Sequence, residues 1–334
     1  MGELYASSYV EQLRNVVINS LAQWGFSPSA SVSLLTVSEN ATFQIINADK
    51  TRYVVRVHRP HYHTQEEIES ELLWIDSLRA AQVVVTPKPI PLVNGGTIAK
   101  FEQDGDSRHM VAFEFMPGEE PSTETALSAG FRQLGAITAQ LHNHTINWTL
   151  PERFTRKTWN FDTTIGASPH WGHWETCPEL TPDDKELLSE SVAIIKTKLD
   201  DFGCGPERFG LIHADLRLAN LLADNDRLAV IDFDDCGFGW YVYDFASAIS
   251  FIEEDPQVPE LLQAWVSGYK DVAELSEADE KMIPIFIMLR RIMLTAWLNT
   301  HSETPTAHEL GVGFIDGTLR MARNMVRSGS PLKS

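Results

Sequence analysis

The residues with the clearest capacity for chemistry lie in the stretch GLIHADLRLANLLADNDRLAVIDFDD, which spans residues 210–235. Two apolar runs, 221–223 and 228–231, flank a polar turn and predict a β-hairpin. A hairpin brings its two ends together, and both ends of this one carry polar side chains. These are His213, Asp215, Arg217, Asn220, Asp232, Asp234 and Asp235.

The division of these residues between the two ends suits phosphoryl transfer. Asp215 and Asn220 precede the first strand, and Asp232 follows the second. A carboxylate at Asp215 can act on the hydroxyl of a substrate, while Asn220 and Asp232 can supply the hard oxygen ligands that Mg²⁺ prefers. Phosphoryl transfer needs an oriented hydroxyl, a metal that bridges the phosphates and a cation over the transferred group, and it asks for little covalent chemistry.

The elements that must position this hairpin divide the chain into two parts. The first 115 residues predict two helices, an antiparallel meander of three strands, and further apolar runs, and Thr64 and Glu67 predict a capping box for the second helix. The helices are expected at 9–24 and 64–78, the strands at 31–37, 42–46 and 52–58, and the apolar runs at 97–101 and 109–115.

Beyond the breaker-rich run at 116–121, the pattern is helical apart from the hairpin. Apolar stripes predict helices around 127–141, 182–199, 259–269, 277–300 and 306–327. We therefore expect an α+β fold with a small antiparallel-sheet lobe over 1–115, a hinge over 116–121 and a larger, mainly helical lobe over 122–334. The larger lobe would hold a catalytic loop at 211–220 and a metal segment at 231–235.

Composition excludes several classes of protein. The 334 residues are 43% hydrophobic and include nine tryptophans, which is too much buriable surface for a disordered chain. The formal net charge of −19 argues against nucleic acids and anionic membranes as partners, because both bind basic surfaces.

Neither export nor membrane insertion is expected. The first residues contain no apolar core of signal-peptide length, and the longest apolar run, 282–289, is interrupted by Pro284. The three cysteines are odd in number and lack C-x-x-C spacing, so neither a disulfide framework nor a zinc site is indicated. We expect a cytoplasmic protein, and no feature of the sequence indicates an oligomeric state.

The motif HADLRLAN resembles the H-x-D-x-x-x-x-N catalytic loop of the aminoglycoside phosphotransferase and choline kinase family, relatives of protein kinases that phosphorylate small molecules. IDFDD resembles the metal-binding segment of that family, and YDFAS at 243–247 resembles its continuation. The resemblance implies a bilobal protein-kinase-like fold that uses ATP, or GTP, together with Mg²⁺. It implies that Asp215 is the catalytic base and that Asn220 and Asp232 are the metal ligands. His213 would hold the base in place, and Arg217 falls where protein kinases carry a lysine beside the γ-phosphate.

The same resemblance extends to the predicted small lobe. SENATF at 38–43 looks like the turn that covers the nucleotide phosphates, which implicates Ser38 and Asn40. YVVRV at 53–57 resembles the strand that bears a phosphate-binding lysine, and Glu71 matches the helix glutamate that pairs with it. FEFMPG at 113–118 resembles the hinge, where the backbone of Glu114 and Met116 would bind adenine.

One position departs from the family pattern. The strand carries Arg56 where the family has lysine, and a planar guanidinium is not geometrically equal to an ammonium. This difference motivates an alternative function, a catalytically silent nucleotide-binding protein. The joint presence of Asp215, Asn220 and Asp232 favours the enzyme.

Several other polar and aromatic residues have structural interpretations. We expect Asp244 to hold the catalytic loop by hydrogen bonds. Arg290 and Arg291, on a late helix, either reach the acceptor site or pack in the core, and the apolar stripe around them favours packing. Packing or capping explains His142 and His144 at a helix end at least as well as substrate contact does. The tryptophan-rich segment 148–174 either packs its own aromatic rings or covers the acceptor as a lid.

The acceptor is the least constrained part of the prediction. The resemblance admits homoserine, choline or ethanolamine, hydroxylysine and aminoglycosides, and the motifs look nearest to the homoserine kinase-like members. Residues 116–334 carry a net charge of −15, against −4 for residues 1–115, which predicts an acceptor that bears an amine. The alternative is that this acidity serves only to keep the protein in solution.

Overall fold

The computed structural model describes residues 7–37, 40–225, 227–302 and 304–332, and it divides into two compact units. The first unit runs to Pro117 and also takes in Leu150–Thr155, and the second holds most of the remaining chain. The boundary after Pro117 falls within the range predicted to be a hinge. The functions assigned to the two predicted lobes stay predictions.

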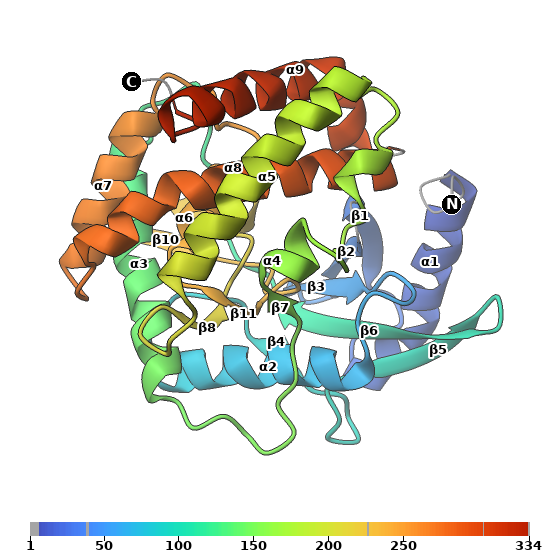
Figure 1. The fold of residues 1–334 in the computed structure, drawn as a ribbon. Helices are drawn as coiled ribbons and strands as arrows, with labels where there is room; N and C mark the ends of the chain where they lie inside the picture. Colours follow the sequence, from blue (N-terminus) through green and yellow to red (C-terminus); the bar gives the residue numbers. More distant parts are fainter. Residues whose placement is uncertain (1–6, 38–39, 226, 303, 333–334) are drawn as a thin grey trace. The chain divides into compact units, whose positions relative to one another are not determined.

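The first unit is built on an antiparallel sheet with the strand order β1-β2-β3-β6-β4, and β5 pairs with β6 (Figure 1). Its strands are β1 (Ser31–Val37), β2 (Ala41–Ile46), β3 (Arg52–Val57), β4 (Pro89–Ile90), β5 (Ala99–Gln103) and β6 (Asp106–Glu114). Its helices are α1 (Ser7–Ser20), which continues as a 3₁₀ turn over Leu21–Trp24, and α2 (Gln65–Ala80). The predicted meander is therefore confirmed.

Apolar side chains at alternate positions of β2 and β3 face the core of the first unit. Phe43, Ile45, Val55 and Val57 are fully buried in one core cluster with residues of α1. Helix α2 begins at the predicted capping box, in which the Thr64 hydroxyl accepts from the Glu67 amide at 3.2 Å and the Glu67 carboxylate accepts from the Thr64 amide at 2.9 Å.

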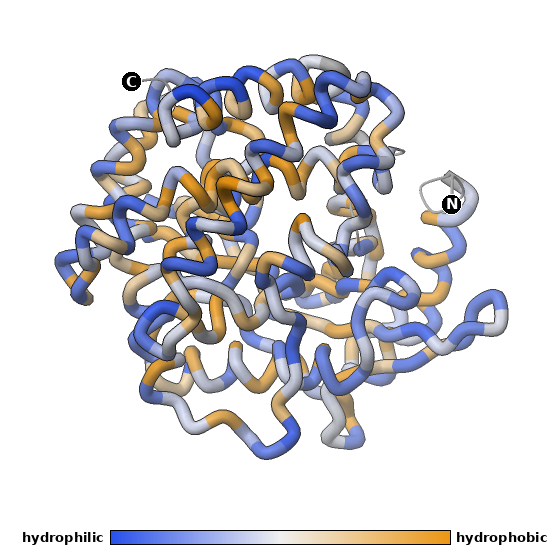
Figure 2. The backbone as a smooth tube through the Cα atoms, viewed as in Figure 1, coloured by the Kyte–Doolittle hydropathy of each residue, from blue (hydrophilic) through white to orange (hydrophobic). Residues whose placement is uncertain are grey.

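The second unit is mainly helical. Its helices are α3 (Ser128–Asn147), α4 (Phe161–Thr164), α5 (Pro182–Phe202), α6 (Tyr243–Ala248), α7 (Val258–Lys270), α8 (Glu277–Thr300) and α9 (Pro305–Ser328). Its strands are β7 (Thr158–Trp159), β8 (Phe209–Ile212), β9 (Leu221–Asp224), β10 (Arg227–Val230) and β11 (Gly237–Trp240). In Figure 2, hydrophilic and hydrophobic residues alternate along these helices, as expected of helices that turn one face to the core.

Helices α3 and α7 pack against each other at very short range. A Cβ atom placed on Gly135 of α3 would lie 2.0 Å from the carbonyl oxygen of Trp265 on α7. A Cβ atom on Gly268 of α7 would lie 1.8 Å from the carbonyl oxygen of Arg132 on α3. Only glycine fits at either position, so the two residues together fix how closely these helices approach.

The predicted hairpin is present as the antiparallel pair β9 and β10, in which Leu221 lies opposite Val230. A second small sheet, in the order β7-β11-β8, was not predicted. Strand β11 has the sequence GFGW, in which both glycines are of a type that is depleted in strands. Its glycines are required by packing, because a Cβ atom at Gly237 would lie 2.5 Å from the Lys157 carbonyl and one at Gly239 would lie 2.6 Å from Ile212.

Among the described residues, α8 is the one helix long and apolar enough to cross a membrane by length and composition. In the most apolar window of α8, 83% of the residues are buried inside the protein. Its composition is therefore that of a core helix. A cytoplasmic location stays a prediction.

Candidate active site

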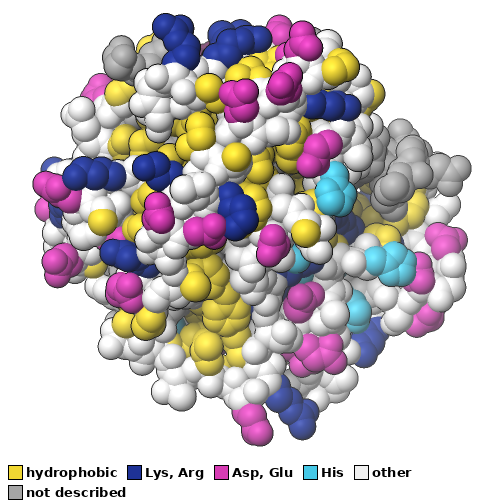
Figure 3. Space-filling model, in the orientation of Figure 1, with side chains coloured by type: hydrophobic (Ala, Val, Ile, Leu, Met, Phe, Trp, Pro, Cys, Tyr) yellow, Lys and Arg dark blue, Asp and Glu magenta, His cyan; other side chains and the backbone are white. Residues whose placement is uncertain are grey.

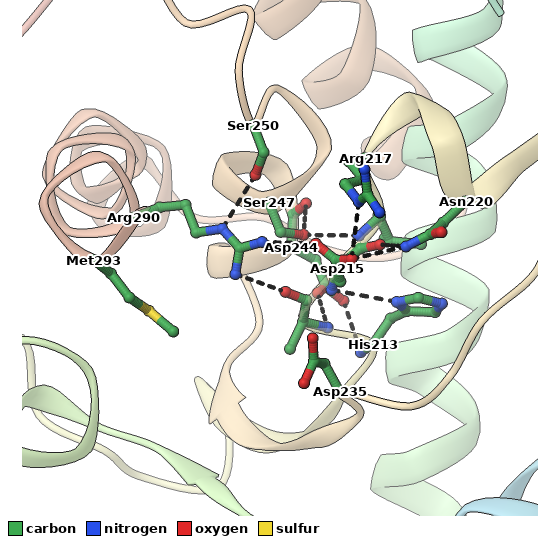
Figure 4. A network of polar contacts seen from close by, with 12 residues as sticks. His213, Asp215, Arg217, Asn220, Asp235, Asp244, Ser247, Ser250, Arg290 and Met293 are labelled. Atoms are coloured by element: carbon green, nitrogen blue, oxygen red, sulfur yellow. Dashed lines mark hydrogen bonds and ion pairs between the residues drawn. The ribbon is translucent and has the colours of Figure 1, made fainter. Parts of the chain in front are cut away.

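The loop between β8 and β9 carries Asp215 and is held by the start of helix α6 (Figure 4). Ala214 has φ of 67°, a left-handed conformation that a residue with a side chain rarely adopts without support. The support comes from Asp244, whose carboxylate accepts from the Ala214 amide at 2.7 Å and from the His213 amide at 3.2 Å. The Ser247 hydroxyl accepts from the Leu216 amide at 3.0 Å. The predicted structural role of Asp244 is confirmed.

A buried histidine connects Asp244 to two further helices. His142 of α3 lies with Nε2 3.0 Å from the Asp244 carboxylate and with Nδ1 3.0 Å from the hydroxyl of Tyr269 on α7. Burial raises the pKa of Tyr269, so its hydroxyl keeps its proton and donates to Nδ1. The proton of His142 then resides on Nε2 and faces Asp244. His142 is thus part of the support for the loop, a role that its position at a helix end did not reveal.

His213 links the loop to the segment before Asp232. Its Nδ1 accepts from the Asp215 amide at 3.3 Å, so its Nε2 carries the proton and donates to the carbonyl of Ile231 at 3.2 Å. The ring also packs on Phe233 at 4.5 Å between centroids. These contacts place His213 where it would hold Asp215 in position.

The Asp215 carboxylate accepts hydrogen bonds on both oxygens. Its Oδ1 accepts from Arg290 at 2.6 Å, and its Oδ2 accepts from Asn220 at 2.7 Å and from Arg217 at 3.2 Å. Burial alone would raise the pKa of Asp215, but the guanidinium groups of Arg217 and Arg290 hold it below its ordinary value. The group is therefore a carboxylate anion, fixed in orientation at both ends.

Asn220 and Asp232 have the chemistry of ligands for a hard divalent cation. The Nδ2 of Asn220 donates to Asp215, so its carbonyl oxygen Oδ1 is directed away from that contact. Asp232 is exposed and has φ of 58°, and its Oδ1 accepts from the Asp234 amide at 3.4 Å. Among the described residues no group of three or more His, Cys, Asp or Glu side chains could hold a metal alone. Two oxygen donors completed by phosphate and water suit Mg²⁺.

The segment that follows Asp232 is fixed by two residues that sequence reasoning missed. Arg156 donates to the carbonyl of Asp234 and, at 2.6 Å, to that of Cys236. The indole of Trp159 donates to the carbonyl of Asp235 at 2.8 Å. Both side chains are buried. A buried arginine beside a strand of two residues has no signature in the sequence, because its partners are backbone groups far along the chain.

Arg290 also belongs to the site, and its contact with Asp215 was not predicted. It lies on α8, and although it packs in the core as expected, its guanidinium reaches Asp215 (Figure 4). A signal for this role was present: adjacent arginines inside an apolar helix require buried anions as partners.

The tryptophan-rich segment packs its own aromatic rings. Trp159, Trp171 and Trp174 are all buried, and the rings of Trp159 and Trp171 lie 5.6 Å apart. Trp171 also lies 6.5 Å from Trp297 on α8 and under the guanidinium of Arg290 at 4.8 Å. These contacts favour the packing interpretation over that of a lid.

In the first unit, Arg56 and Glu71 form the predicted pair. The Nη2 of Arg56 donates to both carboxylate oxygens of Glu71, at 2.7 and 2.6 Å, and both side chains are buried. Arg56 lies on β3, a central strand, and Glu71 lies on α2. The pair therefore connects the sheet to the helix, while its predicted contact with phosphate stays a prediction.

The remaining predicted nucleotide residues also lie in the first unit, except that Ser38 falls outside the described residues. The side chain of Asn40 accepts from the Arg59 amide at 3.0 Å, which braces the β1–β2 turn against the chain that follows β3. Glu114 ends β6, and its amide donates to the carbonyl of Lys88 at 2.8 Å. Met116 is half-buried in the irregular segment beyond β6.

Comparison with known proteins extends over nearly the whole chain. The model of the phosphotransferase enzyme family matches residues 34–280. Amicoumacin kinase of Bacillus subtilis (strain 168) is 23% identical over 95% of this chain and 93% of its own length. Among solved structures, a microcompartment-associated aminopropanol kinase is 40% identical with a TM-score of 0.87, covering 94% of this chain and 98% of its own. An amicoumacin kinase in complex with AMP-PNP and Ca²⁺ is 22% identical with a TM-score of 0.80, covering 99% and 97%.

Proposed function

The chain belongs to the phosphotransferase enzyme family, and from this premise we propose that it transfers the γ-phosphate of ATP to the hydroxyl of a small amino alcohol. It is a kinase of small molecules. The observation that carries the acceptor class is the 40% identity to an aminopropanol kinase over 94% of this chain. The acidity of residues 116–334 is consistent with an acceptor that bears an amine.

In this proposal Asp215 orients the acceptor hydroxyl for attack and receives its proton. Its ionised carboxylate is fixed by Arg290, Asn220 and Arg217, which suits a reaction in which positioning matters more than base strength. Arg217 is 26% exposed at its side chain and can reach the transferred phosphoryl group as a cation. His213 keeps the loop in place through the Asp215 amide.

Asn220 and Asp232 are proposed to hold the metal. Bound Mg²⁺ would neutralise the charge that develops on the phosphates. The protein's own contribution is to fix the two oxygen donors, through the bond from Asn220 to Asp215 and through the bonds of Arg156 and Trp159 to the segment after Asp232.

The nucleotide is proposed to contact residues of the first unit. Arg56, held by Glu71, would bind a phosphate oxygen. The Glu114 amide already donates to Lys88, so the Glu114 carbonyl and the Met116 amide are the backbone groups proposed to bind adenine. The related amicoumacin kinase fold holds AMP-PNP, which supports ATP as the donor.

A panel of acceptors tests the proposed function. Release of ADP should be fastest with 1-amino-2-propanol and related amino alcohols, slower with homoserine, and slowest with uncharged polyols and with bulky aminoglycosides. On the face shown in Figure 3, acidic and basic side chains are interspersed. We propose that carboxylates close to the site attract the amine. The KM of an amine acceptor should therefore rise several-fold between about 0.02 and 0.3 M salt, as the screening length falls from roughly 20 to 6 Å.

Two outcomes would contradict the proposal. Turnover of polyols at rates that match those of every amine would remove the amine from recognition. Nucleotide-dependent stabilisation without turnover of any acceptor would favour the silent nucleotide-binding alternative.

Replacing Arg56 with Ala should weaken the binding of ATP more than that of adenosine, because only the phosphates would contact this side chain. The comparison of the two dissociation constants by calorimetry separates a phosphate contact from a disturbed fold. The matched control is Arg56→Lys, which restores the residue usual in the family and should retain most of the affinity for ATP. Equal losses for ATP and adenosine would mean that the loss of the Glu71 partner had disturbed the first unit instead.

A further inference from the structure

Helix α8 carries two adjacent buried arginines that bind different partners. Arg290 is 2% exposed and Arg291 is 3% exposed. Arg291 donates to the carboxylate of Glu253 at 2.6 Å and to the carbonyl of Phe314 at 2.7 Å, and neither partner touches Asp215 in the described network. Arg290 instead donates to Asp215. The two arginines are thus equally buried but bind different partners.

Every nitrogen of Arg290 has a partner. Its Nε donates to the Ser250 hydroxyl at 3.1 Å, its Nη1 to the Tyr243 hydroxyl at 3.0 Å, and its Nη2 to the Oδ1 of Asp215 at 2.6 Å. One face of the guanidinium lies over the ring of Trp171. A buried cation that is bonded on all three nitrogens is fixed in place and has no surface left with which to bind an acceptor.

We propose that Arg290 is a positioning residue of the phosphotransfer reaction, which fixes the Oδ1 of Asp215 and so holds that carboxylate in one orientation toward the acceptor hydroxyl. This inference rests on the proposed function, in which Asp215 orients the acceptor hydroxyl. It adds a group from α8, 75 residues further along the chain, to the machinery of the catalytic loop.

Two arginines contact Asp215, and their surroundings explain why Arg290 fixes its carboxylate more firmly than Arg217 does. Arg217 reaches the Oδ2 at 3.2 Å from a side chain that is 26% exposed, so solvent screens it and it can swing toward a phosphoryl group. Arg290 is fixed and unscreened at 2.6 Å. His213 donates its ring proton to Ile231 and accepts from the Asp215 amide, and the nearby Asp235 opposes Arg290 by adding negative charge. Arg290 is thus the permanent counter-charge of Asp215.

The fixed contact has a measurable consequence. Without Arg290 the Oδ1 of Asp215 loses its donor at 2.6 Å, while Oδ2 keeps its bonds from Asn220 and Arg217. The carboxylate can then rotate away from the orientation that suits the acceptor hydroxyl, and the loss should fall on kcat.

The test compares three variants of the full chain, with kcat for 1-amino-2-propanol and the KM for ATP as the readouts at one fixed pH. Arg290→Gln should lower kcat by about tenfold or more and should leave the KM for ATP nearly unchanged. Arg290→Lys keeps the charge but loses the fork of donors, so it should recover part of the lost kcat. Arg291→Gln is the matched control: it should lower the melting temperature without lowering kcat.

Two results would overturn the inference: a kcat in Arg290→Gln that equals that of the wild type, or an equal loss of kcat in Arg291→Gln. If Arg290→Gln does not fold, Arg290→Lys decides, because a reduced kcat with an unchanged KM for ATP supports positioning and an unchanged kcat refutes it. Asp215→Asn separates this inference from the proposed function. If that variant turns over normally, the role of Asp215 fails; if it is inactive while Arg290 variants behave as wild type, only the role of Arg290 fails.

Discussion

Asp215→Asn should lower kcat by about two orders of magnitude or more while leaving the affinity for nucleotide nearly intact. The substitution keeps the size of the side chain but removes the charge that faces Arg290 and Arg217, and an amide can no longer receive the hydroxyl proton. The Asn side chain also puts an NH₂ group where one carboxylate oxygen accepted hydrogen bonds. Donors would then face each other at that position.

Steady-state kinetics with an amino alcohol, together with titration of an ATP analogue, measures both halves of this expectation. Asp224→Asn provides a control, because Asp224 is an exposed residue at the turn end of the same hairpin. If the Asp215→Asn variant turns over at the wild-type rate, Asp215 has no role in the mechanism. A parallel loss in Asp224→Asn would show that the hairpin as a whole had been disturbed.

Asp232→Ala should abolish the stabilisation that Mg²⁺ and nucleotide together confer on the protein. The expected result is a melting temperature that rises with ATP analogue and Mg²⁺ in the wild type and does not rise in the variant. Asn220→Ala should have a milder effect and raise the Mg²⁺ concentration required, because it removes a neutral ligand. Thermal melting over a Mg²⁺ titration measures both without any turnover.

The backbone at Asp232 calls for a second variant. Its φ of 58° favours Asn and Asp over other residues with side chains, so alanine adds strain to the loss of the carboxylate. Asp232→Asn keeps the tolerance for this conformation and removes only the charge, so it should fold as stably as the wild type and still lose most of the Mg²⁺ response. Magnesium titrations that remain unchanged in Asp232→Asn, Asp232→Ala and Asn220→Ala would refute the metal assignment.

The parts of the site that depend on local pattern could be predicted from the sequence. The α+β fold class is confirmed, with an antiparallel sheet in one unit and mainly helices in the other. The β9–β10 hairpin follows from two apolar runs around a polar turn, and the pair of Arg56 and Glu71 follows from the family resemblance. In each case the residues that define the element lie within about one supersecondary unit of one another.

The parts that depend on distant contacts were missed. Arg156 supports the metal segment through backbone carbonyls 78 and 80 residues away, and carbonyl groups are identical in every residue, so no side-chain pattern marks such partners. Arg290 was expected to pack in the core, and it does, but its second role depends on how α8 crosses the catalytic loop. Strand β11 escaped prediction because close packing demanded glycines, which are poor indicators of strand.

The close crossing of α3 and α7 bears on which mutations the enzyme can tolerate. His142 and Tyr269 meet behind Asp244 only because Gly135 and Gly268 let the two helix backbones come together. A single added methyl group at either glycine would force the helices apart and loosen the support of the catalytic loop, although every residue that takes part in the chemistry would still be present. A mutated or engineered form of this enzyme therefore needs more than the active-site motif to remain active. It must also keep Gly135 and Gly268, which carry no functional group.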